Sequence, residues 1–343
     1  MARELRVVHY GLGPIEQEIA RLVLETEGLR TVGATDISPD LCGQDLGVVL
    51  GLPRRLRIKV ADDPKRLLRK VRAHVAILST SSSLRRVKPQ VAELLQKGLH
   101  VVTTCEELSF PVPAHQASFR ELDRLARRKR VSLLATGVNP GFAMDALALM
   151  QTAPCSKVTR VSVTRVVDAA TRRLPLQRKI GAGLTMGQFR RAFTDKAVRH
   201  VGLLESAHMI AAGLGWKLDR VEETVEPAIA PRDLDTEHLR VPAGAVAGIR
   251  QHARAYRNGE IVISLDLQIH VGAENPRDHV LIDGTPSIDM TIDGGVAGDT
   301  ATAAMIVNAI PKVVAARRGA LTMRDIPLLH RVNPIEVRAL AGR

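Results

Sequence analysis

Two glycines, Gly11 and Gly13, stand directly after an apolar run and before an amphipathic stretch. A glycine turn between a strand and a helix lets the backbone approach a pyrophosphate, which the N–H groups at the helix start then bind. We therefore predict a dinucleotide-binding turn made of Gly11, Leu12, Gly13, Pro14 and Ile15. Glu16 stands where the fingerprint has its third glycine. We expect this carboxylate to loosen the helix against the strand or to turn outward.

An acidic residue, Asp36, ends the next predicted strand, about 20 residues further on. A carboxylate at this place accepts hydrogen bonds from the adenosine ribose and repels a ribose 2′-phosphate. We therefore predict NAD as the preferred cofactor. NADP stays open because Ser38 and several arginines between positions 54 and 57 follow closely. The alternative role of Asp36 is to cap the turn that continues through Pro39.

Hydroxyls and carboxylates follow two further predicted strands. Ser79, Thr80 and Ser81 are predicted to contact the cofactor, and the alternative is a polar turn that caps a helix. Glu106 and Glu107 come after the next strand. Because ligands of parallel sheets bind beyond the carboxyl ends of the strands, a partly desolvated carboxylate there could act as general acid and base. The alternative is an acidic first turn that favours the helix dipole.

The elements that must position these residues form two patterns. Over the first 145 residues, short strand-like runs alternate with longer amphipathic stretches, which is typical of a doubly wound parallel sheet. The strands predicted there span residues 6–10, 31–36, 75–79, 100–103 and 132–136. Further on, apolar and polar residues alternate over 260–271, and the preceding Asn258-Gly259 predicts a tight hairpin.

These patterns predict an α/β protein. A Rossmann-type doubly wound domain is expected over residues 1–145, followed by an α+β domain with a mostly antiparallel sheet over 146–298. A helix in residues 299–343 is expected to return to the first domain. A capping box at Thr185 and Gln188 predicts one helix start in the second domain.

Composition excludes several other classes. The chain has 343 residues, 45% of them apolar and 25% charged, which is globular and long enough for two domains. The apolar runs are short, so we expect no membrane span, no signal peptide and a cytoplasmic location. The three cysteines are far apart and lack metal-binding spacing, so we expect no metal. A formal charge of +13 favours polyanions, but scattered cations and 2% aromatic residues argue against nucleic acid.

Six segments together carry a family resemblance, and they span residues 10–15, 105–108, 136–142, 174–181, 200–206 and 298–303. They resemble the 2,4-diaminopentanoate dehydrogenases, a group that includes native amine dehydrogenases and is distantly similar to dihydrodipicolinate reductase and homoserine dehydrogenase. The resemblance extends over nearly the whole chain. It implies a Rossmann domain, a second domain that forms the substrate pocket and a homodimer interface, and NAD(P)-dependent interconversion of an amine with a ketone or aldehyde plus ammonia.

The resemblance also implies residue roles. The catalytic glutamate of the family falls on the pair Glu106 and Glu107. We choose Glu106, because homoserine dehydrogenases place a catalytic lysine at the corresponding step after this strand, and Glu107 is the fallback. Asn139 is expected to orient the substrate or a water, although Asn-Pro-Gly is also an ordinary turn. Lys179 and His200 are expected to bind substrate, with structural roles as the alternative.

Three other functions stay open at this point. The chain could reduce a cyclic imine or oxidise a homoserine-type alcohol, and ammonia-dependent oxidation of the reduced cofactor separates these from an amine dehydrogenase. It could bind the nicotinamide cofactor as a sensor without turnover, if Glu16 and the scarcity of aromatic residues mark a degenerate site. It could bind nucleic acid through its positive charge, and salt-sensitive retention on DNA would favour that function.

Overall fold

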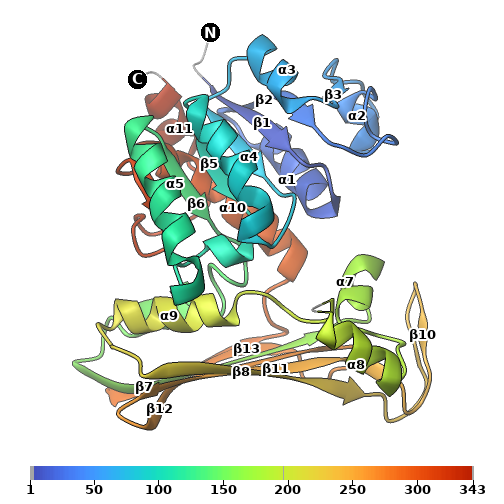
Figure 1. Ribbon diagram of the computed structural model, residues 1–343, viewed down its shortest axis with the longest axis vertical. Helices are drawn as coiled ribbons and strands as arrows, with labels where there is room; N and C mark the ends of the chain where they lie inside the picture. The colour runs from blue at the N-terminus through green and yellow to red at the C-terminus, as the bar shows by residue number, and fades with distance from the viewer. Residues whose placement is uncertain (1–3, 196, 342–343) are drawn as a thin grey trace. The chain divides into compact units, whose positions relative to one another are not determined.

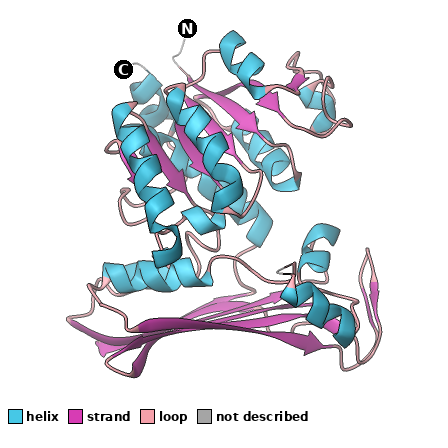
Figure 2. Cartoon of the chain, viewed as in Figure 1, coloured by secondary structure: helices cyan, strands magenta, loops and turns pink. Residues whose placement is uncertain are grey.

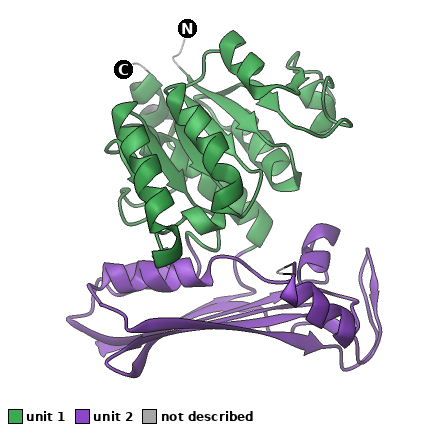
Figure 3. Cartoon of the chain, in the orientation of Figure 1, with its two compact units in different colours: residues 1–141, 297–343 green, residues 142–296 purple. Residues whose placement is uncertain are grey.

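A computed structural model describes residues 4–195 and 197–341 (Figure 1; Figure 2). The chain divides into two compact units, with Met1–Gly141 and Ala297–Arg343 in unit 1 and Phe142–Val296 in unit 2 (Figure 3). The sequence analysis placed the divisions after residues 145 and 298. Unit 1 is therefore assembled from both ends of the chain, whereas unit 2 is continuous. Among the described helices, none is both long and apolar enough to cross a bilayer.

The described residues of unit 1 form a seven-stranded sheet in the order β15-β6-β5-β4-β1-β2-β3. Every neighbouring pair is parallel, which confirms the predicted Rossmann-type sheet. The order reverses between β1 and β4, and open α/β sheets bind ligands at such a point. The strands are β1 (Leu5–Tyr10), β2 (Leu29–Thr35), β3 (Val60–Ala61), β4 (Val75–Leu78), β5 (His100–Thr103), β6 (Ser132–Ala135) and β15 (Gly319–Leu321).

Helices cover both faces of this sheet, because successive strand residues point to opposite sides. Val8 packs in one apolar cluster with leucines of α4 (Leu84–Gln96) and α5 (Gln116–Arg128). Its neighbour Val7 packs in the other cluster with α1 (Pro14–Glu25) and α10 (Gly298–Ala315). The remaining helical elements of unit 1 are α2 (Leu46–Val49), α3 (Pro64–Lys70), α11 (Pro334–Ala341) and the 3-10 turns η1 (Glu106–Leu108) and η2 (Pro113–His115).

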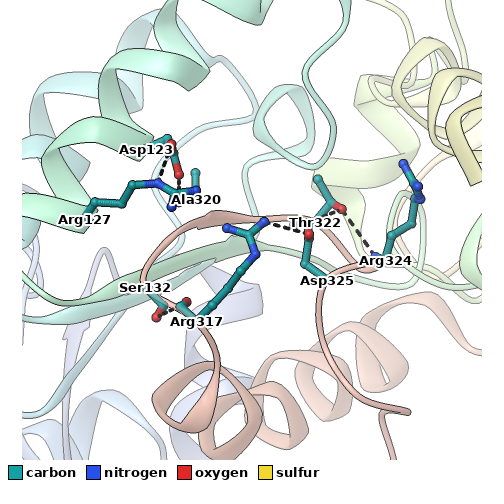
Figure 4. A network of polar contacts seen from close by, with 8 residues as sticks. All are labelled: Asp123, Arg127, Ser132, Arg317, Ala320, Thr322, Arg324 and Asp325. Atoms are coloured by element: carbon teal, nitrogen blue, oxygen red, sulfur yellow. Dashed lines mark hydrogen bonds and ion pairs between the residues drawn. The ribbon is translucent and has the colours of Figure 1, made fainter.

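Polar contacts attach the last strand, β15, to the rest of unit 1 (Figure 4). Asp123 of α5 accepts hydrogen bonds from the Ala320 N–H at 2.9 Å and from Nε of Arg127 at 2.8 Å. The hydroxyl of Ser132, at the start of β6, donates to the carbonyl of Arg317 at 3.0 Å. The side chain of Arg317 in turn binds Asp325 at 2.7 Å. The segment after α10 is therefore fixed at the edge of the sheet beside β6.

Unit 2 contains, within its described residues, a six-stranded sheet in the order β14-β13-β7-β12-β11-β8 and a separate β9-β10 pair. Its pairs are antiparallel except β7 with β12, so the sheet is mostly antiparallel as predicted, with one parallel pair. The strands are β7 (Lys157–Asp168), β8 (Arg220–Ile229), β9 (Leu234–Asp235), β10 (Arg240–Val241), β11 (Val246–Arg257), β12 (Glu260–His270), β13 (Arg277–Thr285) and β14 (Ile288–Asp293).

Local signals in the sequence account for several features of unit 2. Asn258 and Gly259 have φ of 54° and 80°, which confirms the predicted tight hairpin between β11 and β12. The capping box of Thr185 and Gln188 opens α8 (Met186–Thr194), as predicted. From Val262 to Ile269 of β12 the aliphatic side chains are buried, and α9 (Leu203–Gly213) packs on β11 and β12. The other helices are α6 (Ala146–Gln151) and α7 (Leu174–Lys179).

Candidate functional site

The predicted site residues of unit 1 line one edge of the parallel sheet. They follow the carboxyl ends of β2, β1, β4, β5 and β6, which are neighbours in that order and about 4.8 Å apart. Along this edge the chain places Asp36, the glycine turn, the Ser79 to Ser81 segment, the two glutamates and Asn139. The fold therefore gathers polar groups from five distant segments where such sheets bind ligands.

The glycine turn leaves room for a phosphate at the start of α1. Gly11 has φ of 88°, and a Cβ there would lie 2.8 Å from Cγ2 of Thr80 and 3.1 Å from the carbonyl of Ser79. A Cβ on Gly13, by contrast, would meet no atom within 4 Å. Gly13 is the N-cap residue of α1, and no side chain caps the first turn. The backbone N–H groups of this first turn of α1 fit a pyrophosphate, which would accept their hydrogen bonds.

Asp36 holds the glycine turn from the neighbouring strand. Its Oδ2 accepts from the Leu12 N–H at 2.5 Å, and its Oδ1 accepts from the Ser38 N–H at 2.7 Å. The capping alternative considered for Asp36 is therefore present in the structure. A carboxylate offers about four acceptor positions, so one bond to each oxygen leaves capacity for ribose hydroxyls.

Glu16 corrects an expectation, because it neither loosens α1 nor turns outward. Its side chain is fully buried, with Oε1 at 2.6 Å from Nδ1 of His9 and Oε2 accepting from the Ser79 hydroxyl at 2.5 Å. Nε2 of His9 lies 3.1 Å from the Thr31 hydroxyl. Burial raises the pKa of the Glu16 carboxyl, and the hydrogen bonds from His9 and Ser79 oppose that shift. Sequence reasoning missed His9, although a histidine inside an apolar strand near an unexpected glutamate was a signal.

The hydroxyl segment after β4 is bonded within the protein. Besides the Ser79 bond to Glu16, the hydroxyl of Thr80 donates to Oε1 of Gln90 at 2.5 Å. Oγ of Ser81 accepts from the Ser83 N–H at 3.2 Å. These bonds fix the segment beside the glycine turn. The segment would therefore contact a cofactor through its remaining lone pairs and its backbone groups.

The two glutamates after β5 have different surroundings. Oε2 of Glu107 accepts from the Leu84 N–H at 2.8 Å, in the first turn of α4, and lies 3.7 Å from Nε2 of His115. Glu107 thus caps α4, whose own N-cap residue, Ser83, makes no side-chain bond to the helix. Glu106 opens η1 and is half-buried. The capping bond gives Glu107 a structural function.

Cys105, next to these glutamates, is not suited to nucleophilic chemistry. Its side chain is buried, and its thiol donates to the carbonyl of Ser82 at 3.3 Å. Burial, followed by the charges of Glu106 and Glu107, raises the pKa of the Cys105 thiol well above its usual range. The thiol therefore stays protonated at neutral pH, and only thiolates are reactive.

Asn139 lies in a tight turn after β6. Gly141 in that turn has φ of 126°, and a Cβ there would lie 2.6 Å from the backbone nitrogen of Gly137, so only glycine fits. The Val138 N–H donates to the hydroxyl of Thr302 in α10 at 3.3 Å. Both segments of unit 1 thus fix the position of the Asn139 turn.

Within unit 2, the structure brings together Lys179 and His200. Lys179 ends α7, and its charge acts on the His200 imidazole. Burial, followed by Lys179 and Arg165, lowers the pKa of His200 to about 3. The imidazole is therefore neutral near pH 7. The Gln251 side chain binds the backbone of His200, accepting its N–H at 2.9 Å and donating to its carbonyl at 2.8 Å.

An ion pair that sequence reasoning missed is buried in unit 2. Arg165 of β7 donates to both carboxylate oxygens of Asp278 in β13 at 2.6 Å, and the two side chains are 4% and 1% exposed. Arg165 also donates to the Val296 carbonyl at 2.6 Å, and the Val296 N–H donates to Asp278 at 2.8 Å. The pair therefore fixes the last residue of unit 2.

A parallel sheet with a glycine turn at its switch point is typical of a Rossmann-type dinucleotide-binding domain. Residues 142–339 match the family model of the 2,4-diaminopentanoate dehydrogenase C-terminal domain. A 2,4-diaminopentanoate dehydrogenase of Acetoanaerobium sticklandii is 30% identical over 332 residues, covering 95% of this chain and 94% of that protein. The chain thus belongs to the 2,4-diaminopentanoate dehydrogenase family.

Two amine dehydrogenases extend the comparison. One from Streptomyces virginiae is 25% identical over 352 residues, covering 94% of this chain and 96% of that protein. The structure of an amine dehydrogenase from Mycobacterium smegmatis superposes with a TM-score of 0.86 at 25% identity, covering 97% of this chain and 99% of that one. These relatives confirm the interpretation of the sequence as that of an amine dehydrogenase.

Proposed function

We propose that the protein catalyses the reversible, NAD(P)-dependent oxidative deamination of an amine to a ketone or aldehyde plus ammonia. The observation that carries this proposal is the place of Glu106. It follows β5, two strands from β1 and its glycine turn, at the same edge of the sheet. Two strand spacings amount to about 10 Å, within reach of an extended dinucleotide whose pyrophosphate lies at the turn. Family membership supports the same chemistry.

The bound nicotinamide would supply the hydride exchange with the carbon that carries the nitrogen. In the amination direction, Glu106 passes two protons from the ammonium nitrogen to the carbonyl oxygen: its carboxylate takes each proton from the nitrogen and returns the first as the carbinolamine hydroxyl forms and the second as that hydroxyl leaves as water. The cationic iminium of the substrate that results is stabilised by the same carboxylate. Asn139 is proposed to orient the substrate or water. Lys179 and the neutral imidazole of His200 are proposed as substrate-binding groups of unit 2.

A screen of amines with NAD and NADP tests the function. We expect amine-dependent reduction of the cofactor, and ammonia-dependent oxidation of the reduced cofactor with the matching ketone or aldehyde. Reduction of a cyclic imine without ammonia would favour the reductase alternative. Cofactor binding without turnover of any amine would favour the sensor.

NAD is proposed as the preferred cofactor because of the Asp36 carboxylate. We expect Asp36→Ala to lower the ratio of kcat/KM for NAD over NADP by roughly tenfold, since it removes a charged ribose acceptor worth about 1.5–3 kcal/mol. The ratio is the readout, because loss of the bond to Leu12 weakens both cofactors. Asp36→Asn, which keeps an acceptor oxygen without the charge, is the matched control. If Asp36→Ala leaves this kcat/KM ratio unchanged, Asp36 only caps the turn and does not select the cofactor.

We propose a homodimer that forms through unit 2. The polar face of β11 and β12 carries charges of both signs, with Asp266 bound to Arg254 at 2.5 Å and to His252. Such a face can pair with a second copy of itself. We expect light scattering at micromolar concentration to give twice the 37.3 kDa chain mass. A single-chain mass under those conditions would contradict the proposal. The cytoplasmic location and the exclusion of nucleic acid stay predictions from the sequence.

A further inference from the structure

Glu16 lies at the centre of a buried junction that joins four segments of unit 1. We define the Glu16 junction as His9 of β1, Glu16 of α1, Thr31 of β2 and Ser79 after β4. Both carboxylate oxygens are engaged, one by His9 at 2.6 Å and one by the Ser79 hydroxyl at 2.5 Å. His9 and Glu16 are 0% exposed and Thr31 is 6% exposed. The junction therefore occupies the place where a third glycine would let α1 pack closely on β1.

We propose that Glu16 is a positioning residue for the cofactor, which fixes the start of α1 against the loop after β4. This inference rests on the proposed function, because it takes the glycine turn as the pyrophosphate site. Glu16 belongs to the first turn of α1, whose N–H groups would bind the pyrophosphate. Its bond to Ser79 attaches that turn to the segment on the other side of the site.

Ser79 in turn contacts the glycine turn directly. The Ser79 N–H donates to the carbonyl of Tyr10 at 3.0 Å, and a Cβ on Gly11 would lie 3.1 Å from the Ser79 carbonyl. A shift of the Ser79 backbone would therefore displace Tyr10 and Gly11. Through this contact the Glu16 carboxylate holds both ends of the turn, from residue 11 to the first residues of α1.

The carboxyl group of Glu16 is turned away from the open side of the glycine turn, toward His9 and Ser79. A carboxylate at a helix start would compete with an anionic ligand for the positive end of the helix. Here the oxygens point into the sheet, where hydrogen bonds from His9 and Ser79 compensate the charge. The open side of the turn, above Gly13, is left to the ligand.

The test compares Glu16→Gly, which supplies the third glycine of the fingerprint, with Glu16→Gln. The dissociation constant of NADH is measured by its fluorescence, together with the melting temperature and steady-state kinetics. We expect Glu16→Gly to raise the Kd for NADH and the KM for NAD by about tenfold, with kcat at saturating NAD nearly unchanged. Glu16→Gln should bind nearly as the wild type, because its amide can accept from Ser79 and donate to Nδ1 of His9.

Two further variants keep the outcome decisive. Glu18→Gly places a glycine in the same helix at an exposed residue that pairs with Arg21, so it reports the general effect of a helical glycine, and NADH binding should be retained. If Glu16→Gly does not fold, Ser79→Ala removes one bond of the junction while the His9 pair stays, and it should weaken NADH binding by about threefold or more. If Glu16→Gln binds NADH nearly as the wild type does, helix propensity alone does not explain the loss of binding in Glu16→Gly.

NADH binding by folded Glu16→Gly, or by Ser79→Ala, that equals the wild type would overturn the inference. A lower melting temperature with unchanged Kd would also overturn it, because the junction would then only stabilise the fold. Failure of the proposed function has a different signature, since the wild type would bind NADH and turn over no amine. A wild-type chain that does not bind NADH would overturn both.

Discussion

Glu106→Gln is expected to lower amine turnover by roughly a hundredfold or more while the cofactor still binds. The amide has nearly the volume and hydrogen-bonding reach of the carboxylate, but it cannot take up and return a proton. The loss should therefore appear in kcat at saturating substrate. NADH fluorescence measures binding separately, and the Kd should stay close to that of the wild type, because the glycine turn lies two strands away.

Glu107→Gln is the matched control for this prediction. Its Oε2 accepts from the Leu84 N–H, and the amide oxygen of glutamine can accept the same bond. We expect turnover within a few-fold of the wild type and a loss of capping stability of about 1 kcal/mol or less. The opposite ranking of the two variants would move the catalytic role to Glu107. If neither lowers turnover in a folded protein, the carboxylate mechanism is wrong and Lys179 or His200 becomes the next candidate.

Asp278→Ala is expected to destabilise the protein by about 3–5 kcal/mol, because it leaves the Arg165 guanidinium buried without its counter-ion. Alanine cannot accept the two bonds that one terminal nitrogen of Arg165 donates to Asp278, nor the bond from the Val296 N–H. The loss is measured as the shift of the urea unfolding midpoint. The loss of stability should be clearest in the unfolding of unit 2, since Arg165 and Asp278 both lie in the sheet of that unit.

An exposed pair gives the control for the buried one. Arg220 and Glu222 also interact at 2.6 Å, but their side chains are 52% and 53% exposed, so Glu222→Ala should hardly move the midpoint. The double variant Arg165→Met with Asp278→Leu should recover much of the lost stability, because no charge is left unpaired. An unfolding midpoint of Asp278→Ala equal to that of the wild type would contradict the prediction.

The sequence predicted those elements whose signals are local. The strand periods predicted five of the seven strands of unit 1, and together with Asn258-Gly259 they predicted the β11–β12 hairpin of unit 2, whereas β8, β13 and β14 were not predicted. β3 and β15 were missed because two or three residues carry no readable period. The parallel pairing of β7 with β12 joins strands far apart in the chain, and such a pairing leaves no mark in either segment.

The candidate site also contains features that local sequence predicts and features that it does not. Residue type and position after a strand were enough to predict the glycine turn and the acidic residues at the sheet edge. The surroundings of Glu16 were not predictable, because its partners His9 and Ser79 come from other strands. The capping role of Glu107 was not predictable either, because its bond comes from Leu84 of α4, an element that precedes β5 in the chain. Contacts of this kind appear only when the fold is formed.

The division of unit 1 between the two ends of the chain sets the order in which a newly made chain can fold. Ile306 and Ile310 of α10 belong to the same buried cluster as Val7 and Ile77 of the sheet. At about 5–20 residues per second, the ribosome takes on the order of ten seconds to make unit 2 before it reaches α10. During that time unit 2 can fold, whereas α1 packs on this face of the amino-terminal sheet and the area that α10 later covers stays open to water. A chain that stops before residue 297 cannot cover this area, however well its glycine turn is formed.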